Sequence, residues 1–142
     1  MIFLGQHSGE YIVKCADDIF NSYMDMSSQK VLSPDDTVLL KDGDKCKLVE
    51  LSDVRYFETF GNYSKTHFSG GTLLINRSLN YLEKRLPEKS FFRTSRQYIV
   101  NLSHIQKLNK IEGGQFRLLL TCGKKIDVSR RRSNHFMERM TL

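Results

Sequence analysis

Three consecutive arginines, Arg130, Arg131 and Arg132, directly follow Ser129, a residue type that often caps the start of a helix. Because a helix N-terminus carries a partial positive charge, each cation in its first turn is disfavoured by about 0.3–1 kcal/mol. Such local conflicts tend to occur at functional sites, and a helix start rich in guanidinium groups suits an anion such as a nucleic-acid phosphate. Arginine can also donate two hydrogen bonds to guanine, so the cluster could read bases. The alternative is that these side chains only extend into solvent.

A second group of polar residues, 93–97, has apolar residues on both sides. Apolar anchors around a short polar stretch are typical of a loop that a rigid scaffold presents to a ligand. Arg96 and Gln97 are residue types that reach base edges. Ser95 and Thr94 can donate to phosphate oxygens. We therefore interpret this stretch as a second nucleic-acid contact.

A third candidate follows Gly61 and consists of hydrogen-bond donors, which are Asn62, Tyr63, Ser64 and Lys65. A glycine turn followed by donors could contact nucleic acid. Taken alone, the same residues are equally typical of an ordinary β-turn in which Asn adopts a left-handed conformation.

The charge distribution favours a polyanionic ligand for the C-terminal part of the chain. Residues 1–50 contain five Lys or Arg against nine Asp or Glu (net −4), whereas residues 51–142 contain seventeen against seven (net +10). A basic region behind an acidic segment is typical of a polyanion binder, with a lysine-rich solvated surface as the alternative. Many of the basic residues are clustered arginines, which weakens that alternative.

The elements that would position these residues are mostly short strands separated by glycine turns. We expect strands at 37–40, 46–51, 54–58, 63–68, 72–75, 98–100, 105–112, 115–121 and 125–128. One helix is predicted over 79–86, where Ser78 is the N-cap, leucines form one apolar stripe and Pro87 ends the helix. A second helix should begin at the N-cap Ser129 and reach about Met140.

The pattern divides the chain at the turn-forming cluster 33–36. Residues 1–36 are predicted to be an N-terminal leader or linker with one possible short helix within 17–26, and residues 37–142 the folded domain. No stretch has the length of a membrane span or of a signal-peptide core, so we expect a cytoplasmic protein that does not contact membranes. The three cysteines lack C-x-x-C spacing and are expected to be reduced and mostly buried.

The order and spacing of several motifs resemble the LytTR family of bacterial DNA-binding domains. The first half of the resemblance consists of VRYFE (54–58), GNY (61–63) and SLNYLE (78–83). The second half, which matches more closely, consists of FFR (91–93), IVNL (99–102) with Ile105, and GKKIDVSRR (123–131). The similarity covers about residues 37–142.

This resemblance implies a mainly β fold with short helices, in which about ten strands form an elongated, mostly antiparallel arrangement. Family members insert inter-strand loops into successive major grooves and commonly bend the DNA. The resemblance thus implies a transcription regulator that binds double-stranded DNA sequence-specifically, without a cofactor. The corresponding base-reading positions are Asn62, Tyr63, Ser64, Lys65, Ser95, Arg96, Gln97, Arg130 and Arg131. Arg93 would contact the DNA backbone or support the loop, and Arg132 completes the arginine cluster.

Family members often place two copies on direct repeats, and further partners would be RNA polymerase or a regulatory domain. Two departures matter. Many relatives carry His-Arg-Ser or a similar triplet where this chain has Ser95, Arg96 and Gln97, so the loop's role carries over but its base preference does not. Many relatives are also response regulators with a preceding phosphoacceptor domain, which residues 1–36 are too few to form. We therefore expect a stand-alone member or an excised output domain.

Other function classes have less support. Catalysis is not expected, because the histidines at 7, 67, 104 and 135 are dispersed and no residues have the spacing of a metal site. The stronger alternative is a basic β module for single-stranded nucleic acid or RNA, in which Tyr56, Tyr63 and Tyr98 would stack on bases. A module that recognises an acidic protein surface is a third possibility, and the acidic leader could be its internal partner.

Overall fold

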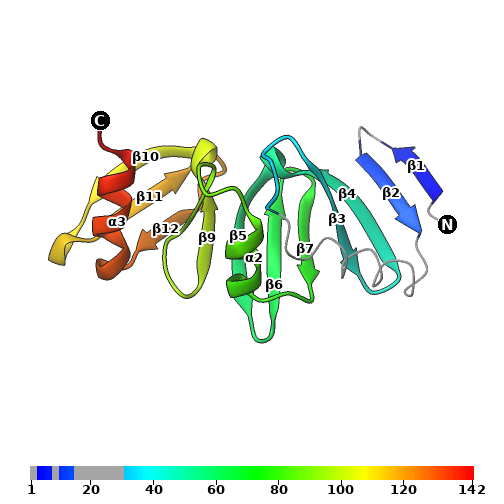
Figure 1. Cartoon of the computed structure of the whole chain (residues 1–142), viewed down its shortest axis with the longest axis horizontal. Coiled ribbons are helices and arrows are strands. Elements are labelled where there is room, and N and C mark those ends of the chain that lie inside the picture. The colour runs from blue at the N-terminus through cyan, green and yellow to red at the C-terminus, as the bar shows by residue number, and fades with distance from the viewer. Residues whose placement is uncertain (1–2, 8–9, 15–30) are drawn as a thin grey trace.

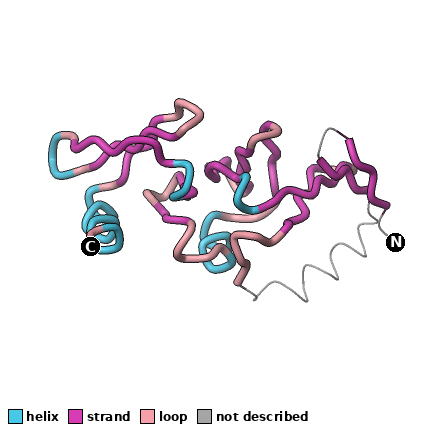
Figure 2. The backbone as a smooth tube through the Cα atoms, turned by 90° about the horizontal axis from the view of Figure 1, so that it is seen from above, coloured by secondary structure: helices cyan, strands magenta, loops and turns pink. Residues whose placement is uncertain are grey.

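The chain folds into an elongated row of sheets with two short helices, and the computed structural model describes residues 3–7, 10–14 and 31–142 (Figure 1). The described residues form three antiparallel sheets that follow one another along the long axis. Both helices lie on the same side of this row (Figure 2). Ten strands, β3 to β12, lie within residues 37–142, so the predicted mainly β fold of about ten strands is confirmed.

The first sheet has the strand order β1-β2-β4-β3. Its strands are β1 (Phe3–His7), β2 (Glu10–Lys14), β3 (Thr37–Asp42) and β4 (Lys45–Glu50). The β3–β4 hairpin was predicted, and Gly43 provides the positive φ that its turn needs. No strand was expected in the leader, yet β2 pairs with β4 along residues 11–13. The short helix predicted within 17–26 lies outside the described residues.

The cysteines differ from the expectation of reduced, buried thiols. Cys46 in β4 is 1% exposed and disulfide-bonded, and Cys122 is a free thiol that is exposed. Cysteine number and spacing could not reveal this, because the strand pairing that places β2 beside Cys46 is not visible in the sequence pattern.

The central sheet has the order β7-β6-β5-β9-β8 and separates two hydrophobic cores. Its strands are β5 (Val54–Phe60), β6 (Tyr63–Phe68), β7 (Gly71–Ile75), β8 (Phe91–Arg93) and β9 (Tyr98–Asn101). Side chains alternate between the faces of a strand, so Phe57 and Ile99 enter one core while Tyr56 and Val100 enter the other. Short 3₁₀ turns at Leu51–Asp53 and Leu102–His104 lead into β5 and into the third sheet.

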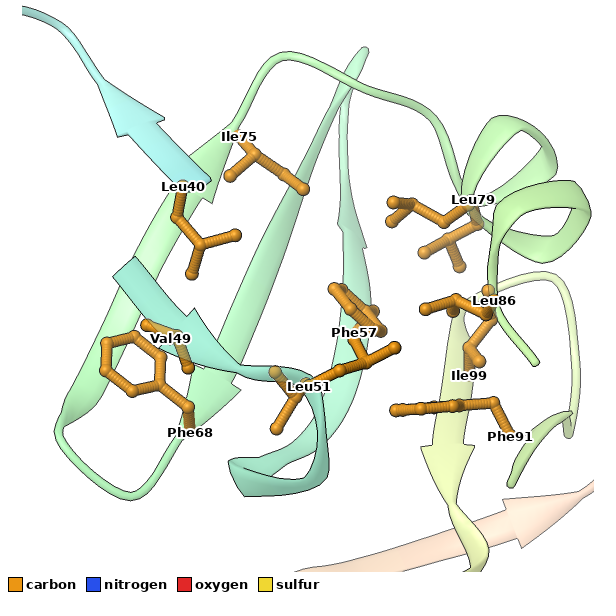
Figure 3. Packing of buried hydrophobic residues seen from close by; sticks show 12 residues of the cluster. Leu40, Val49, Leu51, Phe57, Phe68, Ile75, Leu79, Leu86, Phe91 and Ile99 are labelled. Carbon is orange, nitrogen blue, oxygen red and sulfur yellow. The ribbon is translucent and has the colours of Figure 1, made fainter. Parts of the chain in front are cut away.

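Helix α2 (Leu79–Arg85) covers the first core. It begins as predicted, since the Ser78 hydroxyl accepts a hydrogen bond from the Tyr81 amide at 3.2 Å. The apolar stripe predicted for this helix packs on the central sheet together with residues of β3, β4 and β5 (Figure 3). Because this stripe faces inward, the polar side chains Asn80 and Glu83 are left on the outer face of α2.

The third sheet has the order β10-β11-β12 and encloses the second core with helix α3. Its strands are β10 (Ile105–Lys110), β11 (Phe116–Leu120) and β12 (Lys125–Val128), with a 3₁₀ turn at Glu112–Gly114, and α3 spans Arg130–Met140. As predicted, Ser129 caps α3, and its hydroxyl accepts from the Arg132 amide at 3.3 Å. In the described part of the chain, neither helix is long and apolar enough to cross a membrane.

Candidate nucleic-acid interface

Three segments that the sequence analysis singled out lie along one long edge of the molecule. They are the β5–β6 turn, the loop between β8 and β9, and the start of α3, all at the lower edge of Figure 1. Backbone hydrogen bonds join them: the Thr59 amide donates to the Gln97 carbonyl, and the Ser129 amide donates to the Thr94 carbonyl, both at 2.9 Å. The fold thus brings together residues that are about 70 positions apart in the sequence.

The loop 94–97 has a well-defined internal structure. Thr94 is buried, and its amide donates to the Tyr98 carbonyl at 3.1 Å. The Ser95 hydroxyl accepts from the Gln97 amide at 3.1 Å, which leaves the side chains of Arg96 and Gln97 exposed. Among the described residues, the guanidinium of Arg96 makes no hydrogen bond or ion pair. The two side chains with the best chemistry for reading bases are therefore the ones that this loop presents.

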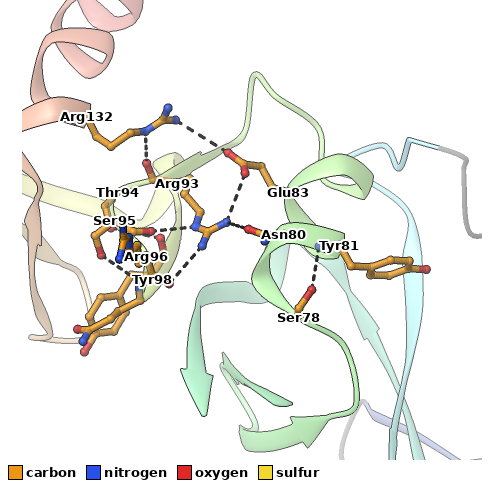
Figure 4. A network of polar contacts seen from close by, with 11 residues as sticks. Ser78, Asn80, Tyr81, Glu83, Arg93, Thr94, Ser95, Arg96, Tyr98 and Arg132 are labelled. Atoms are coloured by element: carbon orange, nitrogen blue, oxygen red, sulfur yellow. Dashed lines mark hydrogen bonds and ion pairs between the residues drawn. The ribbon is translucent and has the colours of Figure 1, made fainter. Parts of the chain in front are cut away.

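Arg93 lies between the 94–97 loop and helix α2 and holds the loop in place (Figure 4). Its Nε donates to the Ser95 carbonyl at 2.8 Å, and Nη2 donates to the Arg96 carbonyl at 3.2 Å. On its other side, Nη1 donates to Asn80 Oδ1 at 2.8 Å and to Glu83 Oε1 at 3.4 Å. Only 15% of the Arg93 side chain is exposed. Of the two roles expected for Arg93, this geometry favours support of the loop.

The three arginines at the start of α3 point in different directions. Arg132 Nε donates to the Arg93 carbonyl at 2.9 Å, and its guanidinium lies over the Phe92 ring. Arg131 is exposed and lines a cleft between α3 and the 94–97 loop. Arg130 turns the other way, and its Nη2 lies 2.7 Å from the position that a Cβ on Gly113 would occupy. The cluster therefore provides one supporting residue and two exposed cations.

The cleft has a volume of about 1060 Å³ and is mostly basic. Its charged lining residues are Glu83, Arg93, Arg96, Arg117, Lys125, Asp127, Arg131 and Arg132. Arg117 and Asp127 form a two-bond ion pair across β11 and β12, with distances of 2.7 and 3.2 Å. The hydrogen bond from the Arg117 guanidinium lowers the pKa of Asp127. The lining of the cleft thus contains one exposed, paired charge, together with the exposed residues Arg96 and Arg131.

The β5–β6 turn exposes aromatic and cationic side chains. Phe60 is 51% exposed and Tyr63 is 44% exposed, and Asn62 lies between them in the turn. Lys65 Nζ lies 4.4 Å from the centroid of the Phe60 ring, within the range of a cation–π contact. Ser64 is fully buried, and its hydroxyl donates to the Arg77 carbonyl at 2.6 Å. The structure therefore brings Asn62, Tyr63 and Lys65 to this edge and turns Ser64 away from it.

A polar network that the sequence analysis missed lies on the sheet behind this turn. Glu58 accepts from Tyr98 Oη at 3.2 Å and contacts His67 Nε2 at 3.1 Å, while the His67 ring stacks on Tyr56 at 4.1 Å between centroids. Burial lowers the pKa of His67, against the opposing effect of the Glu58 carboxylate. Burial also raises the pKa of Tyr56 to about 12. The signal for this network was the alternation of β5 and β6, which places these side chains on one face of the sheet.

The supporting residues on α2 were also missed. Asn80 and Glu83 are three positions apart, so they share one side of the helix next to the leucine stripe, and this side meets Arg93. Within the part of the chain that the structure describes, no group of three or more His, Cys, Asp or Glu side chains could hold a metal ion.

A mainly β domain with a cationic edge built from inter-strand loops and a helix start defines a class of nucleic-acid-binding modules. Residues 44–141 match the family model described as the LytTr DNA-binding domain, and the chain belongs to this LytTR family of DNA-binding domains, as the sequence resemblance implied. Family membership associates the chain with DNA binding and transcription regulation, which is not an enzymatic role.

Individual relatives agree with this assignment. The chain is 29% identical over 140 residues to the transcriptional regulatory protein BtsR of Escherichia coli, covering 89% of this chain and 57% of BtsR. It is 26% identical over 88 residues to the sensory transduction protein LytT of Bacillus subtilis, covering 62% of this chain and 36% of LytT. The chain thus spans between about a third and three fifths of these curated relatives. A solved LytTr DNA-binding domain from Bacillus cereus has a TM-score of 0.69 and 28% identity, covering 75% of this chain and 97% of that domain.

Proposed function

We propose that this chain recognises a specific duplex DNA sequence by placing three segments in successive major grooves. They are the β5–β6 turn, the 94–97 loop and the start of α3. The observation that carries the proposal is the alignment of three cationic segments along one edge, joined by direct backbone hydrogen bonds. Several separated groups of donors along one edge suit the regularly spaced phosphates and grooves of a duplex.

The side chains divide into two groups under this proposal. Arg96, Gln97 and Arg131 are exposed at the rim of the cleft and would read base edges. Asn62, Tyr63, Lys65 and Arg130 would contact phosphates or bases at the two ends of the edge. Arg93, Arg132 and the Ser95 hydroxyl are engaged in holding the loop, so they contribute to binding through its shape.

Binding of single strands or RNA is the competing function, and the exposed rings of Phe60 and Tyr63 are the observation that favours it. Tyr56 and Tyr98, which the sequence analysis also considered for stacking, are engaged in ring and hydrogen-bond contacts within the sheet. The aromatic side chains available for stacking on bases are therefore limited to the β5–β6 turn. This limit favours duplex binding over single-strand binding.

The wider regulatory context is part of the proposal. A LytTR-type regulator would act in the cytoplasm, with two copies on direct repeats and with RNA polymerase or a regulatory domain as further partners. The chain's partial coverage of BtsR and LytT is consistent with an output domain in a larger response regulator.

Selection from a random duplex library, followed by fluorescence anisotropy, tests the proposal. We expect a short motif to be enriched and bound as duplex at least about 10³-fold more tightly than its scramble at physiological salt. Log K should fall with log salt at about 0.9 per neutralised phosphate, for roughly 4–8 phosphates. Preference for the matching single strand, or no enrichment, would replace this function with the single-strand module.

Arg96→Ala and the control Lys89→Ala show whether the lower edge is the binding surface. Both residues are exposed, but Lys89 precedes β8, whereas Arg96 follows it in the loop. We expect Arg96→Ala to weaken binding to the selected duplex and Lys89→Ala to leave it within about twofold, because a distant surface charge contributes little.

A further inference from the structure

The side chain with the least expected position at this basic edge is Glu83, a carboxylate 46% exposed on the outer face of α2. Its two oxygens face two different arginines. Oε1 lies 3.4 Å from Arg93 Nη1, and Oε2 lies 4.0 Å from Arg132 Nη2 (Figure 4). An acidic group beside a DNA-binding surface repels phosphates, so its presence there requires a reason.

The arrangement gives Glu83 a position in a chain of contacts that runs from α2 to the reading loop. Glu83 and Asn80 hold the outer nitrogen of Arg93, and the remaining nitrogens of Arg93 hold the carbonyls of Ser95 and Arg96. Arg132 closes the network by donating to the carbonyl of Arg93. Because a guanidinium is planar and rigid, fixing one end of Arg93 fixes the direction of its other donors.

The same carboxylate also opposes a competing interaction. Arg132 is 32% exposed, and its Nη2 faces Glu83 at the border of the cleft. Without Glu83, this nitrogen would lack its acidic neighbour, and a nearby phosphate would be the alternative partner. Contacts to phosphate carry no sequence information, so they strengthen binding to every duplex equally.

We propose that Glu83 is a specificity-determining positioning residue, which directs Arg93 onto the 94–97 loop and keeps Arg132 away from DNA phosphates. The inference rests on the proposed function and adds to it an acidic residue. This residue lowers the affinity for DNA of any sequence and at the same time holds the 94–97 loop in one conformation. Asn80 shares the positioning role without the charge.

The variant Glu83→Gln removes the charge and keeps the shape of the side chain. We expect binding to a scrambled duplex to strengthen about three- to tenfold, with a salt slope steeper by about 0.9, as for one added phosphate contact. Binding to the selected duplex should strengthen less or weaken, so the ratio of the two affinities falls. The matched control is Glu50→Gln, which makes the same charge change at an exposed residue at the end of β4.

A double variant identifies the arginine responsible. If Arg132 is the group released, Glu83→Gln with Arg132→Ala should return the scrambled-duplex affinity and the salt slope to about the wild-type values. Equal effects of Glu83→Gln and Glu50→Gln would show that the change in affinity reflects net charge alone, and would overturn the proposal. The proposal also fails if Glu83→Gln changes both duplex affinities by one factor at an unchanged salt slope.

Hydrogen exchange on the free protein tests the positioning role separately. In Glu83→Gln and Asn80→Ala, we expect the Thr94 and Gln97 amides to exchange about tenfold faster while the Val100 amide in β9 is unchanged, because only the loop loses its support. Unchanged exchange in both variants would overturn this role. Since these experiments use free protein and scrambled duplex, they remain decisive even if the wild type fails to discriminate a selected site, a result that would count against the proposed function alone.

Discussion

The 94–97 loop and the β5–β6 turn lie side by side on one edge but are built in different ways. The loop has its carbonyls held by Arg93 and its ends joined to neighbouring segments by backbone hydrogen bonds. The turn is a two-residue connection in which Gly61 has a φ of +59°. The contact described for its exposed side chains is a single cation–π interaction between Lys65 and Phe60.

This difference predicts different contributions to binding. Ordering a mobile side chain on binding costs about 0.5–1.5 kcal/mol, so a loop that is already ordered can use more of its contact energy for discrimination. We therefore expect the loop to determine which sequence is bound. The turn can adapt to the DNA surface, and we expect it to add affinity that depends little on sequence.

Removing the support of the loop should have the largest effect. Arg93→Ala deletes four hydrogen bonds of about 1 kcal/mol each, and the loop must then be ordered during binding, so we expect a loss of about 3 kcal/mol on the selected duplex. Anisotropy measures the loss, and Arg93→Lys, which keeps the charge, should recover less than half of it. Full recovery by lysine would mean that Arg93 acts as a charge and not as a support.

Removing a presented side chain should have the next largest effect. We expect Arg96→Ala or Arg131→Ala to cost about 1–3 kcal/mol on the selected duplex if the guanidinium makes two hydrogen bonds to a base. The scrambled duplex should be bound with nearly unchanged affinity. An equal loss of affinity on both duplexes would show that the arginine contacts the DNA backbone. The loop, like the turn, would then add affinity that does not depend on sequence.

Because the Arg130 guanidinium lies close to Gly113, a substitution of this glycine should displace the guanidinium. In Gly113→Ala the new Cβ would lie 2.7 Å from Arg130 Nη2, whereas in Gly114→Ala it would meet nothing within 4 Å. Both glycines have positive φ, so both variants should lose about 1 kcal/mol of folding stability. Only Gly113→Ala should also change DNA affinity. Thermal unfolding and anisotropy separate the two effects, and equal DNA affinities would exclude a role for this placement of Arg130.

The turn should respond weakly to substitution. We expect Phe60→Leu to cost about 0.5–1 kcal/mol on both duplexes, because it removes the ring under Lys65 and keeps an apolar side chain. Anisotropy on the selected and scrambled duplexes gives the comparison. A loss confined to the selected duplex would show that the turn also reads sequence.

The network behind the turn predicts a pH effect on stability, the smallest of these effects. Burial lowers the pKa of His67 below its ordinary value of 6.5, so the unfolded chain binds more protons than the folded one just below that pH. The stabilisation is complete above pH 6.5 and is lost as the pH falls toward the folded-state pKa. Unfolding of the wild type and His67→Gln between pH 5 and 8 should show a smaller acid-side loss in the variant. Parallel plots of stability against pH for the two proteins would show that His67 does not contribute to the pH dependence.

Much of this arrangement could be predicted from the sequence. Nine of the ten strands between residues 37 and 128 and the two serine-capped helices follow from local patterns, whereas the three-residue strand β8 was not predicted. The three segments that meet along this edge were also singled out from local patterns. Side-chain direction could not be predicted, because Ser64 and Arg132 acquire their partners from strands and turns far away in the sequence. The role of Glu83 was also hidden, since an exposed glutamate on a short helix is typical of a solvated surface.

The backbone hydrogen bonds that tie Thr59 to Gln97 and Ser129 to Thr94 have a mechanical consequence. They join strand β5, the 94–97 loop and the start of α3 directly, so the spacing between the loop and the start of α3 is constrained by the protein. DNA is the more deformable partner at such a surface, so differences in groove position would be taken up by the duplex. One base pair inserted between two contacted positions shifts them by about 3.4 Å. We expect the directly joined segments of the protein not to follow such a shift.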